Sequence, residues 1–267
     1  MRLLKACLAE AWGTALLVAI GVSIVIVASA SSGPVVPLVP DAGLRRLITG
    51  FLFGATGALV TVSGVGRASG AHINPAVTLA FWLRRRMPAS HALAYVAAQC
   101  AGAALGGAAL LAWGRTGTTV AFGATLPGRA FGPGLALAGE AVTTATLVIL
   151  LFAFLGRRRL RAWTPLLFPP LYAVMVYLEA PISGTSTNPA RSLGSALAAG
   201  AWQSWWVYWI GPALGVLIAW GVHRLGGLRD LEIEVAKVYH FDHDPSGLFA
   251  DMAQAGRRVA REERGRP

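Results

Sequence analysis

SGAHINPA at residues 69–76 and SGTSTNPAR at residues 183–191 are two versions of one motif, and together they decide the fold. In both, Ser-Gly is followed by three residues and then by Asn-Pro-Ala, and the asparagines, Asn74 and Asn188, lie 114 positions apart. That spacing is close to half of the roughly 225 residues that precede a more polar C-terminal stretch, as an internal duplication would produce. The sequence therefore predicts two structural repeats, each built around one copy of the motif.

The composition is that of a membrane protein. Of the 267 residues, 55% are hydrophobic and only 13% are charged, and the mean hydropathy is +0.58, whereas about a quarter of the residues in soluble domains are charged. In a soluble chain the net charge of +11 would suggest nucleic acid. Here the cations lie between apolar stretches, where they set the orientation of membrane helices. We therefore expect a lipid bilayer, and not nucleic acid, as the partner of the chain.

Six apolar stretches are long enough to cross a bilayer, because each is near the ~20 residues that a helix needs to span about 30 Å of hydrocarbon. The first is also too long for a cleaved signal peptide. The segments that follow the two motifs have only about ten residues, half a bilayer at about 1.5 Å per residue, so we expect them to be re-entrant half-helices. The six stretches lie at about 8–30, 47–66, 88–113, 135–156, 162–178 and 203–222.

The distribution of Lys and Arg predicts the orientation. If the N-terminus is inside, ten of these residues lie inside before the tail, eight lie in the tail and four lie outside. Positive loops stay in the cytoplasm, so we expect both termini there, at a plasma or inner cell membrane. The motifs then enter from opposite sides, which makes the repeats inverted. We expect a channel domain at 1–225, with repeats at about 1–114 and 134–225 joined by an outer loop at about 115–133, and a partly helical or disordered cytoplasmic tail at 226–267.

Asn-Pro is a strong signal for a helix start. The Asn side-chain oxygen accepts from free N–H groups of the first turn, and Pro suits the next position because it has no N–H to leave unpaired. The Asn amide then keeps its N–H donors for a lumen. Irregular backbone at membrane depth needs protein or a water-filled cavity beside it, so segments 67–73 and 179–187 should line such a cavity. The motif residues of the predicted pore are Asn74, Pro75, Ala76, Asn188, Pro189 and Ala190.

Two opposed half-helices bring their positive dipole ends to one point near the midplane. A cation or hydronium ion there meets a positive potential, whereas a neutral water molecule does not. Asn74 and Asn188 are expected each to donate to the oxygen of one passing water, which interrupts a proton wire. These features predict a water-filled path that cations and protons should fail to cross, but they do not determine the solute.

Three ionisable residues are expected at membrane depth, where such residues are functional or structural by default. Arg191 directly follows the second motif and is interpreted as a pore-lining filter cation, with a helix-end Arg that reaches toward the lipid headgroups as the alternative. Glu10 and Glu140 begin the first span of each half. We expect each to accept backbone N–H groups of its re-entrant loop, and not to relay protons, because they lack a chain of partners.

The sequence offers no catalytic or metal-binding set. The predicted midplane holds amides and an Arg but no nucleophile with a base. Cys7 and Cys100 lie in apolar stretches without disulfide or metal spacing. We therefore expect neither an enzyme nor a cofactor nor a bound metal.

These residues resemble the aquaporin and aquaglyceroporin superfamily, the major intrinsic proteins, over roughly residues 4–225. The resemblance implies an all-α membrane protein: a right-handed bundle of six transmembrane helices and two half-helices, assembled as a homotetramer with one pore per subunit. Besides the two motifs, the matching residues are Ala9-Glu10, Ala98-Gln99-Cys100-Ala101-Gly102, Glu140, Ser192 and Trp209-Ile210-Gly211-Pro212.

The resemblance also implies an outer constriction of four residues. Arg191 and Thr185 correspond by their distance from the second motif. Val176 falls where water-specific members resemble one another in having His. The fourth residue is Gly54, or Phe53 if the following loop has one inserted residue. His72 is expected to line the pore.

The residues that separate water from glycerol channels disagree. Gly54 and Val176 make the constriction wide and apolar, whereas Phe53 narrows it. Ser192 and Ala196 stand where glycerol channels resemble one another in having Asp and a basic residue. We therefore favour water, with a facilitator of small neutral solutes such as glycerol or ammonia as the alternative, and a structural membrane protein with a vestigial pore as a remote third.

Overall fold

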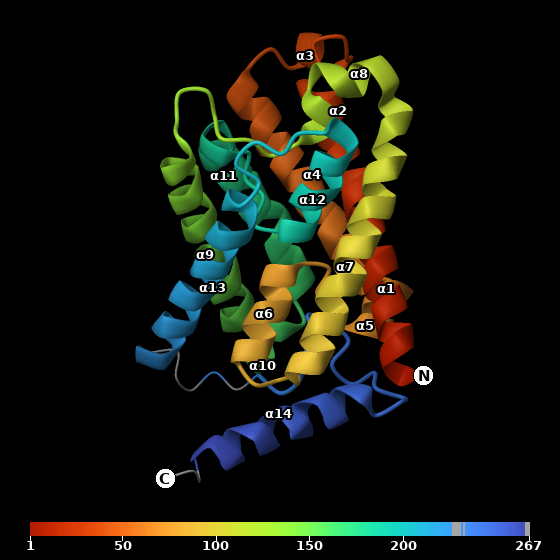
Figure 1. The fold of residues 1–267 in the computed structure, drawn as a ribbon, viewed down its shortest axis with the longest axis vertical. Helices are drawn as coiled ribbons and strands as arrows, with labels where there is room; N and C mark the ends of the chain where they lie inside the picture. Colours follow the sequence, from red (N-terminus) through yellow and green to blue (C-terminus); the bar gives the residue numbers. More distant parts are fainter. Residues whose placement is uncertain (226–230, 232, 265–267) are drawn as a thin grey trace.

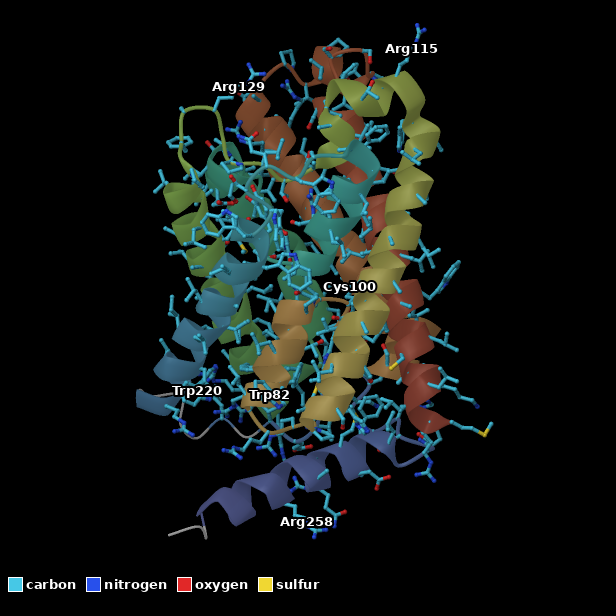
Figure 2. All side chains as sticks on the ribbon, viewed as in Figure 1. Trp82, Cys100, Arg115, Arg129, Trp220 and Arg258 are labelled. Atoms are coloured by element: carbon cyan, nitrogen blue, oxygen red, sulfur yellow. The ribbon has the colours of Figure 1, made fainter. Side chains whose placement is uncertain are left out.

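The computed structural model is all-helical in the residues that it describes, which are 1–225, 231 and 233–264 (Figure 1). Long helices run side by side, and both chain termini lie at the same end of the bundle. We call this the termini end and the opposite one the far end. In Figure 2, Arg115 and Arg129 mark the far end, and Trp82 and Trp220 lie near the termini end.

The two repeats contain corresponding sets of helices, and the connection between the repeats lies at the far end. The first holds α1 (Arg2–Leu16), the π-helical η1 (Leu17–Val22), α2 (Ser23–Ser29), α3 (Val35–Leu38), α4 (Ala42–Val62), α5 (Gly64–Ser69), α6 (Pro75–Leu83) and α7 (Ala89–Leu110). The connection holds η2 (Leu111–Trp113), α8 (Gly114–Thr119) and η3 (Ala121–Gly123). The second holds α9 (Pro133–Leu155), α10 (Arg158–Arg161), α11 (Thr164–Ser183), α12 (Pro189–Ala199) and α13 (Val207–Leu225), and α14 (Leu248–Arg264) follows.

The helices of spanning length correspond to the six predicted stretches. Within the described residues, four segments are long and apolar enough to cross a membrane, namely Arg2–Ser29, Ala89–Thr119, Pro133–Leu155 and Thr164–Ser183. The helices α4 and α13 have 21 and 19 residues, about 30 Å at 1.5 Å per residue, and they pack against α11 and α9. Their ends differ from the predicted ones by only a few residues.

The two half-helices are α6 and α12, with 9 and 11 residues. Figure 1 shows α6 in the half of the bundle nearer the termini end and α12 in the half nearer the far end. Each begins directly after its Asn, in the middle of the bundle. The predicted fold class, spanning helices with two re-entrant half-helices, is thus confirmed.

Glycines allow the helix pairs of each repeat to approach closely, as small residues do in membranes. A β-carbon on Gly102 of α7 would collide with the carbonyl oxygen of Ala11. On Gly215 of α13 it would lie 2.5 Å from the carbonyl oxygen of Ala141. The pairs α1/α7 and α9/α13 therefore pack backbone to backbone.

The tail folds back across the termini end instead of extending from it. In Figure 1, α14 lies crosswise beneath the bundle. Residue 226, the expected boundary between channel and tail, lies outside the described residues. Six buried tail residues join one hydrophobic cluster with Val77 and Phe81 of α6: Ile233, Ala236, Val238, Leu248, Phe249 and Met252.

Candidate pore

The two asparagines cap the half-helices. Asn74 Oδ1 accepts a hydrogen bond from the Ala76 N–H at 2.8 Å, and Asn188 Oδ1 accepts from the Ala190 and Arg191 N–H groups at 3.1 and 3.3 Å. The proline at the first helical position leaves no N–H unpaired. Asn-Pro therefore starts both half-helices at the centre of the protein.

Each asparagine also binds the other repeat. Asn74 Nδ2 donates to the Thr187 carbonyl oxygen, and Asn188 Nδ2 donates to the Ile73 carbonyl oxygen, both at 2.9 Å. The prediction that both N–H groups of each amide face the lumen is therefore wrong for one N–H of each asparagine. Because a carboxamide has two N–H groups, each Asn keeps a second one beside the cavity that both residues line.

The loops before the half-helices hold strained backbone of the same form. Non-glycine residues with positive φ are uncommon and persist only where the surroundings hold them. Gly70 and Gly184, with φ of +85° and +89°, end the helices that precede the loops. The other positive φ values are 58° at Ala71 and 42° at Ile73 in the first loop, and 52° at both Thr185 and Thr187 in the second.

A buried carboxylate holds each loop. Glu10 Oε1 and Oε2 accept the N–H groups of His72 at 3.0 Å and Ile73 at 2.6 Å, and Oε2 also accepts from Gln99 Nε2 at 2.7 Å. Glu10 is fully buried. Charge-assisted bonds to several donors compensate for burial of a carboxylate, so Glu10 acts as an internal anchor for the loop.

Glu140 does the same in the second repeat. Its carboxylate accepts the N–H groups of Ser186 at 2.7 Å and Thr187 at 2.8 Å, and the hydroxyl of Ser183 at 2.6 Å. Glu140 is also fully buried. The two acids therefore occupy equivalent places in the inverted repeats.

Two cavities lie along the bundle. The outer cavity, about 420 Å³ and nearer the far end, is bordered by Arg45, Arg46 and the constriction residues described next. The inner cavity is about 50 Å³ and is lined by Asn74, Asn188 and His72, among others. Phe53 borders both. Phe53 therefore lies where the two cavities meet.

Arg191 and Phe53 face each other between these cavities. The Arg191 side chain is 3% exposed, and its Nη1 donates to the Gly123 carbonyl oxygen at 2.9 Å. Its guanidinium carbon lies 5.9 Å from the centre of the Phe53 ring. The loop that carries Gly123 thus holds the Arg side chain from the far-end side.

Gly54 lies elsewhere. A β-carbon there would stand 2.5 Å from the Phe168 carbonyl oxygen, so this face of α4 packs on α11. Gly54 borders the inner cavity only. The structure thus places Phe53, and not Gly54, beside Arg191.

Val176 and Thr185 border the outer cavity, together with Arg191. Thr185 Oγ1 donates to Glu179 Oε2 at 2.5 Å. Glu179 is 6% exposed, and its Oε1 has no hydrogen-bond partner among the described residues. Glu179 lies at the start of the predicted cavity-lining segment 179–187, but no prediction named it as a site residue. An acid at the first position of that segment was the available signal.

His72 lies in a polar chain at the floor of the inner cavity. Its Nε2 is 3.0 Å from the Ala236 carbonyl oxygen and its Nδ1 is 3.1 Å from Thr78 Oγ1. A carbonyl oxygen only accepts, so Nε2 carries the hydrogen and Nδ1 accepts from Thr78. Thr78 in turn accepts from Gln99 Nε2 at 2.9 Å. The single N–H of the imidazole is therefore used by the tail.

Metal binding finds no support in the described part of the chain, where no group of three or more His, Cys, Asp or Glu residues is arranged to hold an ion. Cys7 and Cys100 are both free thiols.

Spanning helices, opposed half-helices and a path of polar groups between two cavities define a membrane channel. The sequence profile described as "Major intrinsic protein" matches residues 1–223. The chain belongs to the major intrinsic protein family, as the motif resemblance predicts. The expectation that it is a channel and not an enzyme is confirmed by this membership.

Several relatives carry aquaporin names. "Probable aquaporin PIP2-7" of Oryza sativa subsp. japonica is 37% identical over 68% of this chain and 66% of its own length. "Aquaporin-4" of Homo sapiens is 32% identical over 63% of this chain, and only 53% of its length is spanned. "Aquaporin Z" of Photorhabdus laumondii is 31% identical over 84% of this chain and 97% of its own. The chain thus spans about two thirds or less of the first two and nearly all of the third.

A solved structure supports the fold. The aquaglyceroporin from Plasmodium falciparum superposes with a TM-score of 0.67, covering 84% of this chain and 96% of its own. At 18% identity, this likeness concerns the arrangement of helices alone.

Proposed function

We propose that this protein is a passive water channel that excludes ions and protons. The observation that carries the proposal is the inner cavity, where Asn74 and Asn188 each have one amide N–H left over and the space is about 50 Å³. Water occupies about 30 Å³ per molecule in the liquid, so this space suits water in small numbers. Paired donors at the centre orient each molecule by its oxygen.

Exclusion of cations follows from the charges around the path. The N-termini of α6 and α12 present partial positive charge at the centre, and the outer cavity is bordered by Arg45, Arg46 and Arg191. No carboxylate is among the described residues that border this cavity, although Glu179 contacts one of them, Thr185. Oriented water at the asparagines interrupts proton transfer along the path.

The alternative is a facilitator of small neutral solutes, and Val176 is the observation that favours it. This residue gives the outer cavity an apolar wall, which suits the carbon face of a solute such as glycerol. Phe53 argues against this alternative, because its ring narrows the passage beside Arg191. We therefore rank water first.

The proposal includes orientation and assembly. Arginine clusters at residues 84–86 and 157–159 lie toward the termini end, which supports a cytoplasmic location for both termini. Large apolar side chains such as Leu93, Leu105 and Leu166 are 71%, 62% and 61% exposed. We assign these surfaces to lipid and to neighbouring subunits of a homotetramer. Cross-linking in native membranes tests the assembly, and protease access from either side tests the orientation.

Stopped-flow measurements on reconstituted liposomes test the solute. Water and glycerol permeability are measured on the same vesicles, with a trapped pH dye to report proton flux. We expect a water-to-glycerol ratio well above that of protein-free liposomes and proton flux at their background. Fast glycerol entry with weak water flux would establish the alternative instead.

A further inference from the structure

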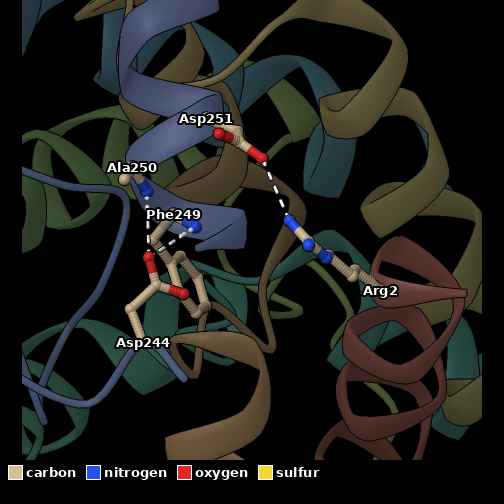
Figure 3. A network of polar contacts seen from close by, with 5 residues as sticks. All are labelled: Arg2, Asp244, Phe249, Ala250 and Asp251. Atoms are coloured by element: carbon tan, nitrogen blue, oxygen red, sulfur yellow. Dashed lines mark hydrogen bonds and ion pairs between the residues drawn. The ribbon is translucent and has the colours of Figure 1, made fainter. Parts of the chain in front are cut away.

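Residues 233–252, which we call the strap, cross the termini end of the pore. They are tied to its rim on several sides. His240 Nε2 lies 3.1 Å from the Val62 carbonyl oxygen at the end of α4, and Arg161 Nη1 bonds Glu234 Oε2 at 3.1 Å. Figure 3 shows the contact of Arg2 in α1 with Asp251 at 3.4 Å. The strap thus spans from one side of the bundle to the other.

The strap forms hydrogen bonds with polar groups of the pore itself. The Val238 N–H donates to the Gly70 carbonyl oxygen at 2.8 Å, and the Ala236 carbonyl oxygen accepts from His72 Nε2 at 3.0 Å. Gly70 and His72 belong to the first re-entrant loop, whose polar groups are the ones that a row of water would need. Strap and water therefore compete for the same donors and acceptors.

The strap also closes the inner cavity sterically. Val238 is one of the residues that line this cavity, together with Asn74 and Asn188. It is 2% exposed and lies in the same hydrophobic cluster as Val77 of α6. The cavity behind it is about 50 Å³, against about 420 Å³ on the other side of Phe53. An apolar side chain therefore forms the floor of the path.

The strap has an ordered internal structure. Lys237 is fully buried, and its Nζ donates to the carbonyl oxygens of His240 and His243 and lies 4.3 Å from the centre of the Phe249 ring. Burial lowers the pKa of the Lys237 ammonium, while the nearby Asp244 carboxylate opposes that shift. A buried charge with partners of its own is a sign of a specific fold.

The start of α14 is fixed in the same way. Asp244 Oδ2 accepts the N–H groups of Phe249 at 3.1 Å and Ala250 at 3.0 Å (Figure 3). This bond places Leu248, Phe249 and Met252 against the channel, where all three are buried. These three side chains hold the strap against the channel, and we call their apolar contact with it the hydrophobic seat.

From these contacts we infer that the strap is an autoinhibitory plug, which closes the termini-end mouth of the pore and has to leave before solute crosses. The inference rests on the proposed channel function and adds its regulation. Two of the ties at the rim, Arg161–Glu234 and Arg2–Asp251, are ion pairs at least partly exposed to solvent, and such pairs contribute little each. The buried side chains therefore contribute most of the binding of the strap. Weakening the hydrophobic seat should therefore open the pore.

The test compares full-length proteins in liposomes. The double variant Phe249→Ala/Met252→Ala removes the seat, and Ala236→Asp, a second route, places a carboxylate in it. Gln254→Ala, on the exposed side of α14, is the matched control. Hydrogen exchange of residues 235–252 reports whether the strap is seated, and stopped flow measures water and glycerol permeability on the same samples.

We expect both release variants to lose exchange protection in the strap and to gain about tenfold or more in permeability. If the closed state is favoured about tenfold over the open one, only about a tenth of the wild-type channels are open. Gln254→Ala should behave as the wild type. A rise in glycerol flux alone would keep the plug and overturn the water proposal. Unchanged fluxes after loss of protection, or wild-type flux as high as that of the released variants, would overturn the plug.

Discussion

The two repeats hold their re-entrant loops in the same way, but the two loops face different surroundings. In each, a fully buried glutamate, Glu10 or Glu140, holds two consecutive N–H groups of a strained loop that precedes an Asn-capped half-helix. Beyond the first loop lies the strap, whose Val238 lines the inner cavity, and beyond the second lies a cavity bordered by arginines. The motifs therefore determine that a path exists, whereas residues outside them determine what closes or selects it.

The loops also differ in the side chains that they offer. The first presents Ala71, His72 and Ile73, and the second presents three hydroxyl residues at 185–187. Hydroxyls both donate and accept, so the second loop suits contact with passing solute. Selection is accordingly expected near the far end and closure near the termini end.

Loss of a loop carboxylate should have the largest effect. Glu140→Ala leaves three buried donors without an acceptor, which lowers the free energy of unfolding by about 3 kcal/mol or more. Glu10→Ala should cost about as much if the repeats are equivalent. Thermal unfolding in detergent measures both, with Glu140→Gln as the milder control. A large loss for one glutamate and none for the other would break the equivalence.

Arg191→Val should change selection without unfolding the protein. Removal of the guanidinium deletes both the cation and the donor beside Phe53, and we expect glycerol permeability to rise about tenfold, which corresponds to a barrier lowered by about 1.4 kcal/mol. Arg46→Val, at the rim of the same outer cavity, is the matched control. Stopped-flow glycerol uptake is the measurement. Unchanged selection in Arg191→Val would remove this residue from the filter.

Substitutions of the neighbours Phe53 and Gly54 should have different effects, because Phe53 lines the pore and Gly54 packs against α11. Phe53→Ala should widen the passage and raise glycerol flux by several-fold. Gly54→Ala should leave the water-to-glycerol ratio unchanged, but its β-carbon meets the Phe168 carbonyl, which costs about 1–3 kcal/mol of stability. Permeability and unfolding are measured on both. The reverse pattern would place Gly54 in the constriction.

Glu179→Ala is expected to have the smallest effect. The Thr185 hydroxyl then loses its acceptor and rotates, which changes the solute ratio by no more than about threefold. Glu179→Gln keeps a carbonyl acceptor and should restore the original ratio. Stopped-flow ratios on the two variants decide the matter, since equal behaviour of Ala and Gln would show that this bond does not position Thr185.

The spanning helices and half-helices could be predicted because their signals are local. Apolar length defines the spans, and Asn-Pro defines both half-helix starts through its capping chemistry. The end of α11 was placed too early because Pro181 and Glu179 interrupt the apolar run, although the helix continues to Ser183. Glu179 was therefore assigned to the irregular segment 179–187 and was not singled out as a site residue.

The remaining features depend on contacts between distant parts of the chain. One residue of loop register decides between Phe53 and Gly54, and no local pattern sets it. The strap was missed for a related reason. The apolar residues around Val238 and Phe249 form only short runs, which resemble those of ordinary surface segments. The surface that they pack against is supplied by the mouth of the channel.

The crossed bonds of the asparagines have a consequence for biosynthesis. Asn74 donates to a carbonyl 113 residues further along, and Asn188 donates back across 115. Translation proceeds at about 5–20 residues per second, so the first asparagine waits roughly 6–23 seconds for its acceptor to be made. Neither half of this protein can therefore complete its centre alone, because each half supplies the acceptor for the asparagine of the other.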